Sequence, residues 1–133
     1  MKKQELEKIA SELVDAALEV HRELGPGLLE NAYEMALCHE LSLKGISFER
    51  QKPMGVNYKG VSLDCGYRID VVAGGELFLE LKSCDQLAPI HEAQLLNYLK
   101  LGDKQLGFLI NFNVRLLKHG IKRIVNGLEE SPA

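Results

Sequence analysis

The sequence predicts an α/β protein in which helices flank a mixed central sheet of about four strands, in the order α-α-β-β-β-α-β. Three observations predict this class. Apolar residues recur at helical spacing over the first 45 residues, whereas the middle of the chain alternates apolar and polar residues as strands do. A third helical stretch and a continuous apolar run follow. With 133 residues, 46% of them hydrophobic, the chain is expected to form a single domain over 1–133.

Two helices are expected before the sheet. Apolar residues spaced by three and four between Leu6 and Val20 predict a helix over 3–23. The tripeptide "GPG" that follows should end it, because Gly and Pro both disfavour helix. A second apolar stripe predicts a helix over 28–44, and Gly45 suits its C-terminal cap.

The strands are expected in two groups separated by a helix. Residues 46–58 alternate weakly and are interrupted by Pro53 and Gly55. The other expected elements are strands at 61–72 and 76–82, a helix at 89–101 and a strand at 105–113 that is covered on both faces. The tail at 116–128 fits either a short helix or an edge strand.

Composition narrows the class of protein. The net charge is -3, with 5 basic and 10 acidic residues in 1–49, and 11 basic and 9 acidic residues in 50–133. Residues 111–128 contain four basic residues and no acid, which predicts either a phosphate-contacting edge or a solvated face. The three widely spaced cysteines are typical of free thiols. There is no apolar run long enough to span a bilayer and no signal-peptide pattern, so we expect a cytoplasmic protein without a membrane partner.

The turn at Ala73-Gly74-Gly75 sets the register of a hairpin. A three-residue loop over 74–76 would pair Ala73 with Leu77, and would place Asp70 opposite Glu80 with their Cβ atoms about 5 Å apart. A two-residue loop would instead turn Glu80 to the other face of the sheet. The three-residue loop is a common type, and glycine accepts its left-handed position.

Two opposed carboxylates on neighbouring strands repel each other. When half-buried they should share a proton or hold a hard cation, magnesium first and then manganese or calcium. Lys82 lies two residues beyond Glu80 and so on the same face of the strand. The alternative is an ordinary hairpin whose charged face is exposed to solvent.

Three stretches of the sequence resemble motifs of one protein superfamily. Asp70 followed by "ELK" at 80–82 resembles the D…(D/E)-x-K signature of the PD-(D/E)xK nuclease superfamily, with Ile69 where the motif has proline. "QLLNY" at 94–98 resembles the Q-x-x-x-Y element of its RecB-like branch. "GLLENAY" at 27–33 is similar to the G-x-x-E-x-x-Y pattern of the small GxxExxY family. The resemblance implies a restriction-endonuclease-like core.

The same resemblance, over about residues 10–126, implies a metal site. Asp70, Glu80 and the backbone carbonyl of Leu81 would bind Mg²⁺, with Mn²⁺ as a substitute. Glu30 would complete the acidic cluster, directly or through a water molecule. The metal would activate water and neutralise charge on the phosphate.

Three further residues would complete the catalytic set, which is Glu30, Asp70, Glu80, Lys82, Gln94 and Tyr98. Lys82 would orient the attacking water or stabilise the phosphate in the transition state. Gln94 and Tyr98, one turn apart on a helix, would position Lys82 or the nucleic-acid backbone. The alternative for Gln94 and Tyr98 is an ordinary amphipathic helix face, and Tyr33 fits core packing as well as a site.

The function implied is a magnesium-dependent, DNA-binding hydrolase that cleaves phosphodiester bonds in DNA, within DNA repair or processing. Two alternatives stay open: a catalytically inactive interaction module with the nuclease fold, and a phosphoesterase that acts on a small nucleotide. Because the chain is short and acidic, we expect a homodimer or a helicase-type partner protein to supply further DNA-binding surface.

Overall fold

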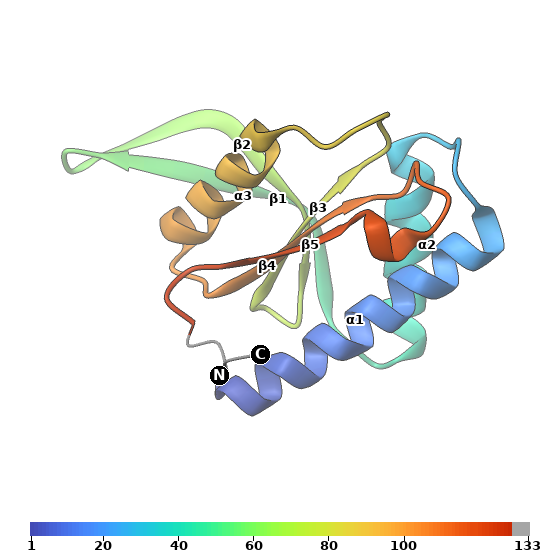
Figure 1. The fold of residues 1–133 in the computed structure, drawn as a ribbon. Coiled ribbons are helices and arrows are strands. Elements are labelled where there is room, and N and C mark those ends of the chain that lie inside the picture. The colour runs from blue at the N-terminus through green and yellow to red at the C-terminus, as the bar shows by residue number, and fades with distance from the viewer. Residues whose placement is uncertain (129–133) are drawn as a thin grey trace.

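The computed structural model describes residues 1–128, which form a five-stranded mixed sheet between two helical layers (Figure 1). The elements are α1 (Lys3–Leu24), α2 (Glu30–Leu43), β1 (Phe48–Tyr58), β2 (Val61–Ala73), β3 (Leu77–Lys82), α3 (Pro89–Gly102), β4 (Leu106–Asn111), the short 3₁₀ helix η1 (Leu117–His119) and β5 (Ile121–Val125). The α/β class and the element order are therefore confirmed, with one strand more than the four expected. The last five residues of the predicted domain, 129–133, lie outside the described residues.

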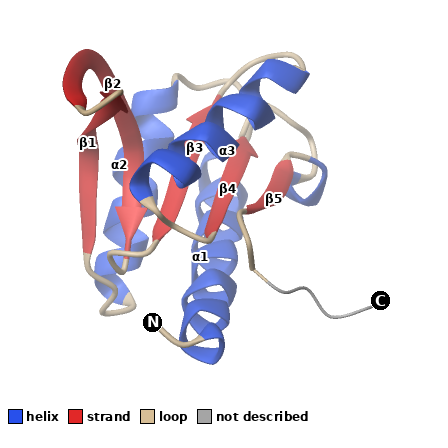
Figure 2. Cartoon of the chain, turned by 90° about the vertical axis from the view of Figure 1, so that its left-hand side faces the viewer, coloured by secondary structure: helices blue, strands red, loops and turns tan. Residues whose placement is uncertain are grey.

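The strands lie in chain order, β1-β2-β3-β4-β5. All neighbours are antiparallel except β3 and β4, which are parallel because α3 connects them as a crossover. Figure 2 shows α3 on one face of the sheet and α1 and α2 on the other. Within the described residues, no helix is long and apolar enough to cross a membrane.

The predicted hairpin loop is confirmed. Ala73 pairs with Leu77 and Val72 with Phe78, which leaves 74–76 as the loop. Gly74 and Gly75 have φ values of 61° and 73°. Residues other than glycine rarely adopt this left-handed backbone conformation. Two consecutive glycines are therefore what the loop requires.

The two segments whose secondary structure the sequence did not determine both lie at edges of the sheet. Residues 116–128, which fitted either a helix or a strand, contain η1 followed by β5, and β5 pairs with β4 over Ile121–Val125 at one edge of the sheet. At the other edge, β1 continues through Pro53 and Gly55 as one strand. An edge strand tolerates proline because only one of its sides forms ladder hydrogen bonds.

The core has two parts, one on each face of the sheet. On the α1 and α2 face, Leu77, Leu79 and Leu81 of β3 pack with the apolar stripe of α1. On the α3 face, Phe78 packs with Leu95, Tyr98, Leu99 and Leu109. Packing at Gly107 is tight, because an added Cβ would lie 2.8 Å from the carbonyl oxygen of Phe78 on β3 and 3.3 Å from the side chain of Leu95 on α3.

A two-stranded arm, residues 55–67, projects beyond the body of the protein on the α3 side (Figure 1). Most of its side chains are exposed. It begins where the β1–β2 register shifts between Met54 and Val56. Because β2 pairs with β3 only over residues 71–73, the arm has no neighbour in the sheet besides its own two strands.

Candidate active site

The two predicted carboxylates meet where the β2–β3 ladder ends. The last paired residues are Val71 and Leu79, and beyond them side chains replace the backbone ladder. The Asp70 amide donates to Oε1 of Glu80 at 3.3 Å, and the Leu81 amide donates to Oδ2 of Asp70 at 2.8 Å. Each carboxylate is therefore fixed by the backbone of the opposite strand, and the two lie together as the three-residue loop predicted.

Strict alternation breaks at this point of β2. Ile69 and Val72 both belong to the core under α3, whereas Val71 packs on the opposite face. Regular alternation along β2 would put Asp70 and Val72 on one face and Ile69 and Val71 on the other, and the structure departs from that pattern. The physical reason is that β2 and β3 separate after Val71, which lets the Asp70 carboxylate turn between the strands toward the Leu81 amide.

Burial raises the pKa of both acids, and a neighbouring carboxylate adds to the shift of each, Asp70 for Glu80 and Glu34 for Asp70. Glu80 is 8% exposed. Desolvation, and then the charge of Asp70, raise the pKa of Glu80 to about 8. The pKa of Asp70 is also raised, by burial first, although its hydrogen bonds from Leu81 and Gln51 oppose the shift. Without a cation, this pair therefore tends to retain a proton at neutral pH.

The donor chemistry fits a hard divalent cation. Asp70 and Glu80 supply two carboxylates at one point, and Mg²⁺ is usually bound by one or two carboxylates with water and substrate oxygens as the other ligands. Within residues 1–128, no group of three or more His, Cys, Asp or Glu side chains forms a compact metal cluster. Glu30 is thus not gathered with the pair into such a group.

Lys82 is half-buried at the end of β3, two residues beyond Glu80. Its positive charge lowers the pKa of Asp70 and of Glu80, which opposes the effect of burial. Among the ion pairs of the described residues, none involves Lys82. Its ammonium group is therefore close enough to lower the pKa of both acids, although it forms no ion pair with either.

Glu30 reaches the same region from the first turn of α2. It is exposed and lines a pocket of about 250 Å³ together with Asp70, Gln51, Glu34 and Arg50. The start of α2 is held in place by Tyr33, described next. The structure therefore brings Glu30 to the Asp70 side of the site, facing a shared cavity.

Tyr33 is fully buried and serves as a structural residue. Its hydroxyl donates to the Gly25 carbonyl at 2.6 Å and accepts from the Leu28 amide at 3.1 Å. Its ring stacks on Phe112, with 4.5 Å between the centroids. The tyrosine of the "GLLENAY" stretch thus fixes the α1–α2 loop against the sheet and sets where Glu30 begins its helix.

A polar network beside Asp70 was not anticipated from the sequence. Glu34, 5% exposed on α2, accepts two hydrogen bonds from Arg50 through Oε2, at 2.8 and 3.0 Å. Its Oε1 accepts from Nε2 of Gln51 at 2.7 Å, and the same nitrogen donates to Oδ1 of Asp70 at 3.2 Å. Gln51 therefore connects a buried helix acid to one of the candidate metal ligands.

The backbone at Gln51 is unusual for its residue type. Its φ is 51°, in the left-handed region. It stands opposite Asp70, between the pairs Arg50–Val71 and Lys52–Ile69. Both strands are thus distorted at one level of the sheet. Non-glycine residues in this conformation concentrate at functional sites, where the surrounding structure holds them.

Gln94 and Tyr98 lie on α3, which covers the opposite face of the sheet from α2 (Figure 2). Nε2 of Gln94 donates to the Tyr98 hydroxyl at 2.9 Å. Burial raises the pKa of Tyr98, and the charges of Glu80 and Asp70 add to that effect. These two residues are one turn apart on α3, as predicted, and their pair lies within electrostatic range of the carboxylates.

The fold is consistent with a restriction-endonuclease-like core, because a mixed sheet flanked by helices presents the two acids and a lysine on adjacent strands. A model of the PD-(D/E)XK nuclease superfamily matches residues 7–124, and the chain belongs to this superfamily. Neither the curated proteins nor the solved structures gave a match.

Membership has two chemical consequences. The superfamily carries out nuclease-like hydrolysis of phosphodiester bonds, and its members act on nucleic acid. Its nucleases generally use divalent metal ions. Both agree with the donor chemistry of Asp70 and Glu80.

Proposed function

We propose that this single domain is a magnesium-dependent nuclease that hydrolyses phosphodiester bonds in DNA during DNA repair or processing. The observation that carries the proposal is the hydrogen-bonded pairing of the half-buried Asp70 with the buried Glu80, with Lys82 beside them. "GLLENAY" at 27–33 and "QLLNY" at 94–98 support the finer assignment to the GxxExxY family and the RecB-like branch.

Asp70, Glu80 and the Leu81 carbonyl would hold Mg²⁺, with Mn²⁺ as a substitute. When bound, the cation supplies positive charge at the phosphate and makes water a better nucleophile at neutral pH. The reciprocal hydrogen bonds of the two carboxylates support this role, because they hold both groups at one point before any ligand arrives.

Lys82 would orient the attacking water or stabilise the charge that develops on the phosphate. Its place beside two acids but outside any described ion pair supports that role. The hydrogen-bonded pair of Gln94 and Tyr98 would position Lys82 or the nucleic-acid backbone. Glu30 would act from the neighbouring pocket, directly or through water.

Binding of DNA would require surface beyond this small acidic chain. A homodimer or a helicase-type partner protein would supply it. The net charge of -3 supports this part of the proposal, since phosphate contacts depend on basic side chains. A monomer that cleaves DNA unaided would contradict it.

The test is cleavage of linear, circular and single-stranded DNA, with free nucleotides as further substrates, in Mg²⁺, Mn²⁺ or EDTA. We expect cleavage of DNA with either metal and none in EDTA. Lys82→Ala should abolish cleavage without changing the circular dichroism spectrum. The matched control is Lys8→Ala, which removes an exposed lysine from α1.

Three outcomes would contradict the proposal. Cleavage that survives Lys82→Ala means that the assigned site is wrong. Turnover of free nucleotides without cleavage of DNA indicates a small-nucleotide phosphoesterase. Absence of both metal binding and cleavage, in a folded protein, indicates an inactive interaction module.

A further inference from the structure

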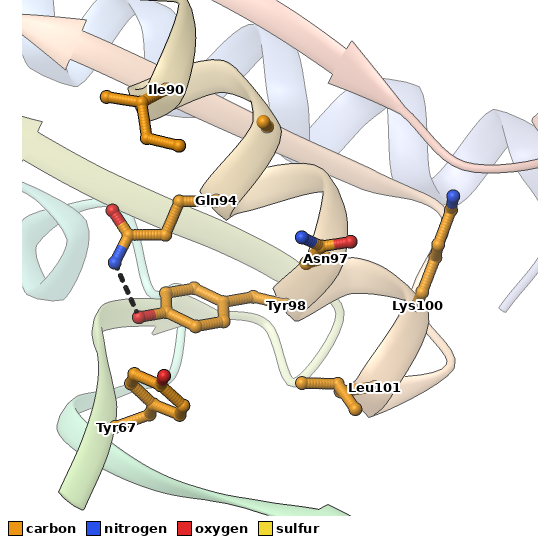
Figure 3. Close-up of a pocket in the computed structure, with 8 residues that line it drawn as sticks. Tyr67, Ile90, Gln94, Asn97, Tyr98, Lys100 and Leu101 are labelled. Atoms are coloured by element: carbon orange, nitrogen blue, oxygen red, sulfur yellow. Dashed lines mark hydrogen bonds between the residues drawn. The ribbon is translucent and has the colours of Figure 1, made fainter. Parts of the chain in front are cut away.

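A groove of about 500 Å³ lies between α3 and the base of the arm (Figure 3). Its main walls are Tyr67 from β2 and one face of α3 with Ile90, Gln94, Asn97, Tyr98 and Leu101. The volume is within the range of small-molecule sites in proteins. The catalytic proposal uses Gln94 and Tyr98 but leaves the rest of this groove without a role.

The apolar part of the wall is unusually open to solvent. Tyr67 is 44% exposed, Ile90 69% and Leu101 42%. The Tyr67 ring lies 5.8 Å from the ring of Tyr98, inclined by 54°. Figure 3 shows the two rings close together at the same end of the groove. The exposed Tyr67 ring, with the buried Tyr98 ring packed beside it and aliphatic side chains nearby, offers a surface suited to a flat, apolar-faced ligand.

The polar part of the wall suits a negatively charged ligand that also has groups able to donate and accept hydrogen bonds. Gln94 and Asn97 each present an amide that both donates and accepts. In the part of the chain that is described, the Asn97 amide and the Lys100 ammonium group form no hydrogen bond or ion pair. Lys100 is the only charged residue among those that line the groove there, although the whole chain is acidic.

Tyr98 connects the groove to the region of the two acids, because it also packs in the core under α3 with Ile69, the neighbour of Asp70 in β2. Tyr98 lines the groove, and its hydroxyl is bonded to Gln94. The same phenol is within electrostatic range of Glu80 and Asp70. A polymer whose phosphate lay at the two acids would therefore extend past Tyr98 into this groove.

We propose that the groove binds unpaired bases of single-stranded nucleic acid, with a base stacked on Tyr67 and its edge bonded by Gln94 or Asn97. This rests on the proposed nuclease function and names its substrate class. A duplex hides the faces of its bases, whereas a single strand exposes faces that stack on aromatic side chains and edges that bond to amides. The groove offers both kinds of contact together with Lys100 for a phosphate.

The test is fluorescence anisotropy of labelled oligonucleotides, in EDTA and in the Lys82→Ala background so that the strand stays intact. Single-stranded DNA should bind more tightly than a duplex of the same length, and a ribose strand of equal length shows whether the sugar matters. Tyr67→Ala should weaken single-strand binding by roughly 5- to 150-fold, whereas Tyr67→Phe, which keeps the ring, should stay within about 3-fold.

The matched control is Tyr58→Ala, which removes an exposed tyrosine near the tip of the arm, outside the groove. It should leave single-strand binding unchanged. Equal losses in Tyr58→Ala and Tyr67→Ala overturn the proposal, and so does equal affinity for duplex and single strand. A dimer in sedimentation that Tyr67→Ala dissociates also overturns it, because the groove is then an interface between two copies.

Cleavage by the unmodified protein in Mg²⁺ is scored separately. Cleavage without any preference for single strands overturns the proposal that the groove binds unpaired bases, and it leaves the nuclease proposal intact. Single-strand binding that depends on Tyr67, without cleavage in any metal, supports the groove and overturns the nuclease proposal.

Discussion

In the absence of divalent metal, the stability of this protein should fall as the pH rises through neutrality, chiefly because of Glu80. Burial and the neighbouring charge of Asp70 raise the pKa of Glu80 from 4.5 to about 8 in the folded protein. The unfolded chain leaves this carboxyl in water, where it ionises near its ordinary pKa. Over this range the folded state therefore binds a proton that the unfolded state releases.

The sign and size of the effect follow from that difference. Unfolding releases a proton between about pH 4.5 and 8, so the free energy of unfolding decreases as the pH rises. The slope approaches about 1.4 kcal/mol per pH unit for one proton, or roughly 3 kcal/mol between pH 5.5 and 7.5. The stabilisation is fully present below the unfolded pKa and is lost as the pH rises through the folded one. The pKa of Asp70 shifts in the same direction, so its contribution has the same sign.

The perturbation is Glu80→Gln, which removes the charge and keeps an oxygen that can accept from the Asp70 amide. Urea unfolding in EDTA at pH 5.5, 6.5 and 7.5 should show a clearly flatter slope for this variant, and a more stable protein at pH 7.5. Glu76→Gln is the matched control. Glu76 lies in the same hairpin, but it is more exposed and pairs with Lys104 at 3.5 Å, so its removal should leave the slope as it is.

The three proteins share every ionisable group other than the substituted carboxyls, so any pH dependence that those shared groups contribute is common to all three. The comparison between variants therefore isolates Glu80. Equal slopes for the unmodified protein and Glu80→Gln would refute the reasoning, because they would mean that Glu80 ionises as it does in water.

Three other predictions concern the same regions. Mg²⁺ at about 100 times its Kd should stabilise the protein by about 2.7 kcal/mol, seen as a higher Tm, and Asp70→Asn should remove this gain; an unchanged gain would place the metal elsewhere. Arg50→Ala should destabilise the fold by roughly 1–3 kcal/mol in urea unfolding, because Glu34 keeps a buried carboxylate without its main partner; Lys52→Ala, which removes an exposed and weaker pair, is the control. Gly107→Ala should cost about 1–3 kcal/mol, since the new methyl group would press against the Phe78 carbonyl of the neighbouring strand β3; a neutral result would mean that β3 and β4 can shift to admit it.

The elements that could be predicted are those that local chemistry determines. The first two helices, α1 and α2, end at glycine and proline signals. Each of their predicted bounds lies within two residues of the observed one. The hairpin register followed from Gly74 and Gly75, because a loop with left-handed positions fixes which residues face each other. Asp70 and Glu80 could therefore be placed together before the structure was known.

The polar network was missed because it depends on tertiary packing. Glu34 lies one turn after Glu30, between positions that face the core, and an acid on a buried helix face was the available signal. The distortion at Gln51 carries no sequence signal of its own, since glutamine rarely adopts a left-handed φ. The groove beside Tyr67 is formed by two segments about 30 residues apart, and alternation alone could not bring them together.

The chain order of the strands bears on how this protein is made. Because every strand lies beside its predecessor in the sequence, each can dock as the ribosome releases it, and the carboxylate hairpin can form before the rest of the sheet. The longest connection between neighbouring strands is that from β3 to β4, so β3 has no second neighbour until α3 has been synthesised and β4 follows. During that interval the leucine-rich β3 presents an open edge, the state in which strands associate with other chains. The connection through α3 is thus where nascent chains would most need protection from aggregation.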